Sequence, residues 1–415
     1  MRILFCCESY WPSRGGVQEV IRQIAERMAS AGHEVAVAAR RQADRTSHVH
    51  NGVRIHEFDV SGNLVTGMRG EVERYQDFIK SFDGDAILIK AAQQWTFDAL
   101  WPVLDDITVR KVFVPCGFSG LFEPSYAGYF QQMPAILRKF DHLIFYAEQY
   151  RDIDFARAHG IDSFSIIPNG ASEIDFDRVT GGRLRAKFGI PETDFLFLTV
   201  GSPIAAKGHK EVEDAFLRMD LGGRAATLIL NGTSPSRRPS DLLRPQTLAR
   251  GVAMLRRDGW SGVRARLFPK RVTVAAAAND TRRILRLDLP RSDVLDAFME
   301  ADLFVFASKV EYSPLVLFEA AAAGTPFLTV PAGNAAEIVR WTGGGMLCPA
   351  DVDVRGYVRV SPDVLALEME KAMKSPDLLR RLGAAGHQAW RERFTWKAIA
   401  KSYERVLRGE AVLAS

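Results

Sequence analysis

Short apolar runs alternate with helical periods along most of the chain. In the first part, runs at residues 2–7, 34–39, 53–58, 86–90, 111–115, 143–146 and 164–167 predict buried strands. Between most of them lie stretches with a helical period, such as 17–31, which repeats apolar residues on one face and ends at Gly32. Alternation of this kind is typical of a parallel, doubly wound sheet.

A second alternation follows the turn-forming residues Pro168, Asn169 and Gly170. Its predicted strands are 195–200, 227–230, 272–276, 284–287 and 303–307. Because 415 residues suit two domains of ordinary size, we expect an α/β protein of two Rossmann-like domains. We place the domains at 1–175 and 176–393.

Two acidic residues bracket the start of one predicted helix. The stretch 311–319 reads Glu-Tyr-Ser-Pro-Leu-Val-Leu-Phe-Glu and follows the buried run 303–307. Pro314 suits a first helical turn, so the free amides of Leu315 and Val316 can face a ligand, with Glu319 about a turn further in. Carboxylates accept hydrogen bonds from sugar and ribose hydroxyls. The alternative is that Glu311 only caps the helix and Glu319 is an exposed helix residue.

Two other strand-to-helix loops carry residues suited to a diphosphate. Gly15 and Gly16 follow the first strand, where backbone N–H groups can approach an oxyanion, although a glycine pair is most often a simple turn. Lys207 follows the strand 195–200 and can supply positive charge to a leaving diphosphate, or it can be an ordinary surface lysine. Arg291 lies just beyond a strand end, where it can reach a phosphate or remain on the surface.

The stretch 311–319, followed by Ala-Ala-Ala-Ala-Gly-Thr-Pro, resembles the signature of retaining glycosyltransferases of family 4, which have the GT-B fold. The resemblance implies two Rossmann-like domains with parallel sheets facing across a cleft, and a C-terminal segment, 394–415, that crosses back to the first domain. It implies transfer of a sugar from a nucleoside-diphosphate-sugar to a hydroxyl acceptor, with a glycan or lipid-linked glycan as the expected class. Retention of anomeric configuration, with no metal and no cofactor required, is implied in the same way.

The resemblance also implies roles for individual residues. Glu311 contacts the donor sugar, Glu319 the ribose, and the amides after Pro314 the sugar hydroxyls, and we take Glu311 and Lys207 as the catalytic pair. The full donor-side set is Gly16, Ser202, Lys207, Glu311, Pro314, Leu315, Val316 and Glu319. The acceptor-side candidates are Gly15, Trp95, Cys116, Gly117 and Phe118.

The chain departs from the family pattern at two positions. Ser202 stands where many members carry an arginine that is paired with the lysine, and Cys116 stands near the place of a histidine. These departures keep open the alternative of a non-catalytic protein that binds nucleotide-sugar. A donor-hydrolysing or epimerising enzyme of the same fold is a second alternative.

Composition adds the expected location and one candidate surface. With 47% hydrophobic and 25% charged residues, no signal peptide and no long apolar run, we expect a cytoplasmic protein with four reduced cysteines. The net charge is +4, yet residues 234–292 hold 14 Lys and Arg against 4 Asp, a local balance of +10. This basic segment predicts peripheral contact with an anionic membrane, against the alternative of a solvated helical surface. Nucleic-acid binding is a further alternative, which we do not expect.

Overall fold

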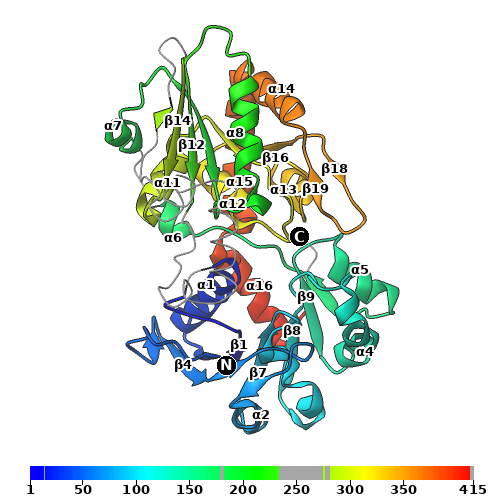
Figure 1. The fold of residues 1–415 in the computed structure, drawn as a ribbon. Coiled ribbons are helices and arrows are strands. Elements are labelled where there is room, and N and C mark those ends of the chain that lie inside the picture. The colour runs from blue at the N-terminus through cyan, green and yellow to red at the C-terminus, as the bar shows by residue number, and fades with distance from the viewer. Residues whose placement is uncertain (14, 178–181, 233–273, 276–280, 412–415) are drawn as a thin grey trace, which may run out of the picture.

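The computed structural model describes residues 1–13, 15–177, 182–232, 274–275 and 281–411, and these form two α/β lobes, one above the other (Figure 1). The blue and cyan lobe contains the N-terminal part of the chain, and the green to orange lobe the C-terminal part. Each lobe is built on a mostly parallel sheet with buried apolar clusters on its faces. The predicted fold class, an α/β protein of two domains built on parallel sheets, is confirmed.

The first sheet has β1 in its middle and runs β10-β9-β8-β7-β1-β2-β4-β3. Its pairs are parallel except for the antiparallel edge pair β3·β4. A strand such as β7 is buried along its whole length, because helices cover both faces of the sheet. The strands are β1 (Arg2–Cys6), β2 (Glu34–Arg40), β3 (Val49–His50), β4 (Val53–Phe58), β7 (Ala86–Lys90), β8 (Arg110–Val114), β9 (His142–Phe145) and β10 (Phe164–Ile166), with a hairpin of β5 (Val60–Ser61) and β6 (Arg69–Gly70) beside them.

The helices of this lobe fill the connections between its strands. α1 presents a buried apolar stripe to the sheet, as its period predicted. The helices of this lobe are α1 (Gly16–Ser30), α2 (Val72–Lys80), α3 (Trp95–Asp98), η1 (Trp101–Asp106), η2 (Pro124–Tyr126), α4 (Ala127–Leu137) and α5 (Arg151–Ala158).

The second sheet runs β13-β14-β12-β11-β15-β16-β17 and is parallel except for β13·β14. Its strands are β11 (Phe195–Val200), β12 (Ala226–Asn231), β13 (Val274–Ala275), β14 (Arg282–Leu287), β15 (Leu303–Phe306), β16 (Phe327–Thr329) and β17 (Gly345–Leu347), and a hairpin of β18 (Asp351–Val352) and β19 (Val358–Arg359) lies apart from it. The helices are α6 (Glu173–Phe176), α7 (Leu184–Phe188), η3 (Ala205–Lys207), α8 (His209–Arg218), α11 (Arg291–Glu300), α12 (Leu315–Ala323), α13 (Ala335–Thr342), α14 (Pro362–Met373) and α15 (Pro376–Ala389).

The chain crosses back to the first lobe at its C-terminal end. After α15 and the π-helical turn η4 (Trp390–Phe394), the amide of Trp396 donates to the carbonyl of Ala171 at 3.2 Å, and the amide of Ala171 donates to Phe394 at 3.0 Å. α16 (Trp396–Arg408), drawn in red in Figure 1, then packs against α1 with its apolar face in the core of the N-terminal lobe. The domain limits at 175 and 393 stay predictions.

The predictions made from composition concern a basic segment, the cysteines and long apolar runs. Most of the basic segment 234–292 lies outside the described residues. Cys6, Cys7, Cys116 and Cys348 are free thiols, and the first two and the last are buried. Among the described helices, none combines the length and apolarity needed to span a bilayer.

Candidate active site

A cavity of about 810 Å³ lies between the two lobes, where the carboxyl ends of both parallel sheets meet. This is where an α/β fold places its ligands. Among the predicted site residues, the structure brings Gly15, Gly16, Cys116, Lys207, Glu311, Pro314, Leu315, Val316 and Glu319 to the cavity wall.

Lys207 and Glu311 meet although 104 positions separate them in the sequence. Lys207 ends η3 in the loop after β11, and Glu311 lies in the loop after β15, the strand next to β11. Lys207 Nζ lies 2.5 Å from Glu311 Oε1, which also accepts a hydrogen bond from Ser308 Oγ at 2.7 Å. The Glu311 side chain is 12% exposed and that of Lys207 29%, so both are sheltered within the cavity. The pair therefore puts a fixed ammonium ion and a fixed carboxylate side by side.

Gly208 determines where Lys207 can lie. Its φ of +71° is in the left-handed region, and a Cβ built on it would lie 1.9 Å from the carbonyl oxygen of Ala307. The loop that carries Lys207 therefore presses directly on the segment after β15, and only glycine permits that approach.

We expect Gly208→Ala to displace Lys207 from Glu311 and to lower kcat/KM for the reaction of this cavity by about 10-fold or more, because small misplacements of charged groups are costly in catalysis. Steady-state kinetics, with a melting curve for each variant, measure the effect. Gly222→Ala is the matched control, since Gly222 also has a positive φ, +56°, but has open space where a Cβ would be. Equal losses in the two variants would show that backbone strain alone, and not the position of Lys207, is responsible.

The N-terminus of α12 faces the cavity. Pro314 is its N-cap residue, and the helix begins at Leu315 with no side-chain cap. The first amides of a helix have no partner within it, and they carry the positive end of its dipole. Pro314, Leu315 and Val316 line the cavity, so these amides supply donors to an oxygen-rich ligand.

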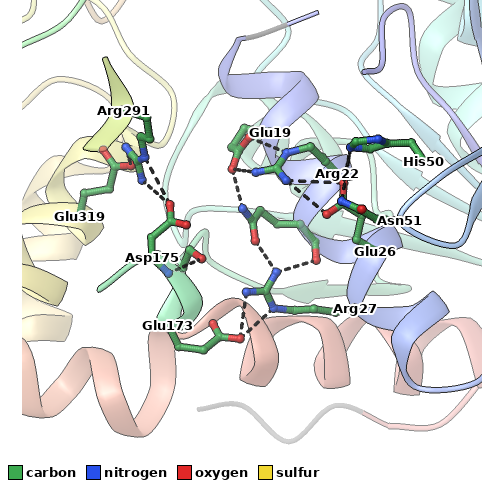
Figure 2. Close-up of polar contacts among 12 residues, drawn as sticks. Glu19, Arg22, Glu26, Arg27, His50, Asn51, Glu173, Asp175, Arg291 and Glu319 are labelled. Atoms are coloured by element: carbon green, nitrogen blue, oxygen red, sulfur yellow. Dashed lines mark hydrogen bonds and ion pairs between the residues drawn. The ribbon is translucent and has the colours of Figure 1, made fainter. Parts of the chain in front are cut away.

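Glu319 pairs with Arg291 at the cavity wall. Arg291 Nη1 lies 2.6 Å from Glu319 Oε1, and Arg291 Nη2 lies 3.0 Å from Asp175 Oδ2 (Figure 2). Burial raises the pKa of Glu319, while the neighbouring Arg291 guanidinium acts in the opposite direction. Arg291 therefore lines the site, instead of projecting from an unrelated surface.

The N-terminal lobe contributes the opposite wall. Gly16 is the first residue of α1 and lines the cavity. A Cβ built on it would meet open space, so its backbone is accessible from the cavity.

Three of the acceptor-side candidates do not line the cavity. Trp95 and Phe118 are buried in the core, Trp95 edge-on to Tyr75 and Phe118 edge-on to Phe130 and Phe155. Gly117 donates its amide to buried Asp152 at 2.7 Å. On the donor side, Ser202 is exposed beside cavity-lining Gly201 without lining the cavity itself.

Sequence reasoning missed several residues of the N-terminal wall. Lys90, at the carboxyl end of β7, is 1% exposed, hydrogen-bonds the hydroxyl of Tyr146, and has a pKa lowered by burial. A lysine that ends a buried apolar strand is the sequence signal that would have found it. The rings of Trp11 and His50 stack with centroids 4.2 Å apart, and burial lowers the pKa of His50.

Potential metal ligands do not cluster in the part of the chain that the structure describes. Within the described ranges, no group of three or more His, Cys, Asp or Glu side chains is placed to hold a metal ion. Basic side chains that line the cavity include Lys207, Arg291, Arg22 and Lys90.

Two family models match the chain, one in each lobe. A glycosyl transferase 4-like domain matches residues 15–170, and a model described as glycosyl transferases group 1 matches residues 279–389. Together they cover more than half of the sequence.

Curated proteins and solved structures are similar to the chain as well. A D-inositol 3-phosphate glycosyltransferase of Streptomyces bingchenggensis is 31% identical over 154 residues, which are 35% of this chain and 31% of that protein. One of Streptomyces griseus is 26% identical over 248 residues, 58% of this chain and 45% of that protein. The matched segments thus span less than half of either relative.

Solved structures match almost the whole chain, and two of them serve as examples. A sucrose-phosphate synthase of Thermosynechococcus elongatus gives a TM-score of 0.69 at 18% identity, with 98% of each chain covered. Anabaena HepE in complex with UDP-glucose gives 0.62 at 16% identity, with 99% of this chain and 100% of that one covered. At these identities the matches establish a shared fold.

Proposed function

Because this chain belongs to the GT-B glycosyltransferases, with a glycosyl transferase 4-like domain followed by a group 1 domain, we propose that it moves a sugar from a nucleoside-diphosphate-sugar to a hydroxyl acceptor. We propose further that the anomeric configuration is retained. The donor binds mainly to the C-terminal lobe, and the acceptor to the N-terminal lobe.

One observation carries this proposal. The ammonium of Lys207, the carboxylate of Glu311 and the first amides of α12 share one cavity, and Gly16 lies on its opposite wall. The cavity volume of about 810 Å³ is in the range of pockets that enclose small ligands and cofactors. A glycosyl transfer needs this combination. Positive groups offset the negative charge that develops on the departing diphosphate, and a carboxylate accepts hydrogen bonds from the sugar's hydroxyls and so holds the sugar in place.

Each group has a role that follows from its chemistry. Lys207 and the positive end of α12 offset charge on the leaving diphosphate. Glu311 accepts hydrogen bonds from the sugar and holds Lys207 in position. Most of the remaining gain comes from holding the acceptor hydroxyl and the anomeric carbon together between the lobes. The polar groups of this chain carry out these steps. Lys207 offsets the diphosphate charge without a neighbouring arginine, because Ser202 stands where many members of the family carry one.

The acceptor is proposed at the level of class. The names of the curated relatives specify an inositol phosphate, whereas the family resemblance and the basic segment 234–292 favour a glycan or lipid-linked glycan at a membrane surface. The groups around Arg22 favour an uncharged, hydroxyl-rich acceptor portion next to them, because the carboxylates of Glu19 and Glu26 more than offset the positive charge of the Arg22 guanidinium. Membrane contact and a cytoplasmic location stay predictions.

We expect nucleoside diphosphates and their sugars to raise the melting temperature of the protein in a thermal-shift panel. A ligand at about 100 times its Kd adds about 2.7 kcal/mol to the stability of the unit that binds it. A panel of UDP-, GDP- and ADP-sugars identifies the donor. No shift with any member of the panel would count against a nucleotide-sugar site.

The donor found in this way then separates the rival functions. A transferase consumes it only when an acceptor is present, whereas a hydrolase or epimerase consumes it alone. A non-catalytic protein binds it and consumes none with any acceptor.

A further inference from the structure

Arg291 connects Glu319 to the segment between the two lobes. Arg291 is the first residue of α11, Glu319 lies in α12, and Asp175 lies in α6, which follows directly on the N-terminal sheet (Figure 2). Nη1 of Arg291 contacts Glu319 Oε1 at 2.6 Å. Nε and Nη2 of the same guanidinium donate to Asp175 Oδ2 at 3.3 and 3.0 Å.

The Arg291 guanidinium contacts a carboxylate on each of two edges, and these contacts fix the orientation of its plane. One edge holds Asp175 with two donors, and the remaining terminal nitrogen holds Glu319. A lysine ammonium has no such fork and could not maintain both contacts with the same geometry. The Glu319 side chain is 14% exposed, so its carboxylate is sheltered and depends on this partner more than a surface carboxylate would.

A second contact anchors α6 to the N-terminal lobe. Glu173, two residues before Asp175, accepts from Arg27 Nε of α1 at 2.9 Å, and both side chains are largely buried. Asp175 therefore holds Arg291 from a helix that is itself held in place (Figure 2). Oε1 of Glu319 contacts Arg291, and Glu319 lines the cavity, where its carboxylate keeps further capacity to accept hydrogen bonds.

We propose that Arg291, held by Asp175, is a positioning residue that fixes the Glu319 carboxylate for the ribose hydroxyls of the donor, and so sets the preference for ribonucleotides over deoxyribonucleotides. This inference rests on the proposed function, since it requires a nucleotide in the cavity. A site built to bond a hydroxyl rejects an analogue that lacks it, because the polar group of the site is left unpaired. Without Arg291, the Glu319 carboxylate is neither oriented nor favoured as an anion, and the site discriminates less strongly against deoxyribonucleotides.

The test measures binding of UDP, GDP and ADP, each with its 2′-deoxy and 3′-deoxy forms, by isothermal titration calorimetry. For the nucleotide that binds best, we expect wild-type protein to bind at least one deoxy form about 10-fold or more weakly, the size of a lost hydrogen bond to a charged group. In Arg291→Met the ratio of the deoxyribonucleotide Kd to the ribonucleotide Kd should fall to about 3 or less, because the ribonucleotide loses affinity while the deoxy form loses little. Arg291→Lys should keep part of the ratio, and Asp175→Asn should give an intermediate value.

The outcomes separate the inference from the function on which it rests. If wild-type protein binds none of the nucleotides, the proposed function is wrong. If it binds one but treats the ribose and deoxyribose forms alike, or if Arg291→Met and Asp175→Asn both discriminate as wild type does, the inference is wrong while the proposed function stands. Arg218→Met is the matched control, because Arg218 forms a comparable ion pair with Asp363 on the exposed surface, at 2.7 Å. A purely structural role for Arg291 would weaken binding of ribose and deoxyribose forms equally.

Discussion

Lys207→Ala is expected to lower the turnover number for sugar transfer by about 100-fold or more, as is typical when a group that stabilises developing charge is removed. Lys207 faces the cavity, and its ammonium lies beside Glu311 near the N-terminus of α12. Charge on the leaving diphosphate is greater in the transition state than in the bound donor. The loss should therefore appear more in kcat than in KM. Steady-state kinetics with the donor found by thermal shift measure it.

The control for this variant is Lys210→Ala. Lys210 lies three residues further on, in α8, with a side chain 78% exposed and paired with Asp214. The Lys210→Ala substitution changes the net charge by the same amount as Lys207→Ala. Because Lys210 does not line the cavity, the kinetics of this variant should match wild type. A Lys207→Ala variant with wild-type turnover would remove Lys207 from the mechanism.

The site residues that sequence predicts well are those whose position follows from a strand end. Lys207 and Glu311 each lie in a loop after a buried strand of the second sheet, and adjacent parallel strands bring such loops together. The local pattern at Pro314 likewise fixes the start of α12 and the direction of its free amides. The overall fold was predictable for the same reason, because the alternation of strands and helices repeats along both halves.

What the sequence does not determine is where a side chain turns after its strand ends. Trp95 follows β7 by five residues, yet α3 folds it into the core, where hydrophobic burial outweighs exposure to the cavity. Lys90 ends β7 and reaches the cavity wall instead. The position of Arg291 next to a strand end was predictable, but its partner Asp175 lies 116 positions away in the sequence, and only the packing of α6 against α12 brings the two together.

Glu311→Gln is the second variant for which we expect a large effect, a loss of about 100-fold or more in turnover. Glutamine keeps the size of the side chain and can still accept from Ser308, but it removes the negative charge that holds Lys207. Hydrogen bonds from sugar hydroxyls to a neutral amide are also weaker than those to a carboxylate. Glu368→Gln, which breaks an exposed pair with Lys371 at 2.7 Å, is the matched control and should leave turnover unchanged.

The double variant Lys207→Ala, Glu311→Gln distinguishes the two ways in which Glu311 can act. If Glu311 serves only to hold Lys207, the double variant should be no slower than Lys207→Ala, because the carboxylate has nothing left to position. If Glu311 also bonds the sugar, the double variant should be slower than either single one, though by less than the product of the two losses, since the side chains are in direct contact. We expect the second result, because the carboxylate faces the cavity as well as its lysine. Losses that multiply fully would instead mean that the 2.5 Å contact contributes nothing to turnover.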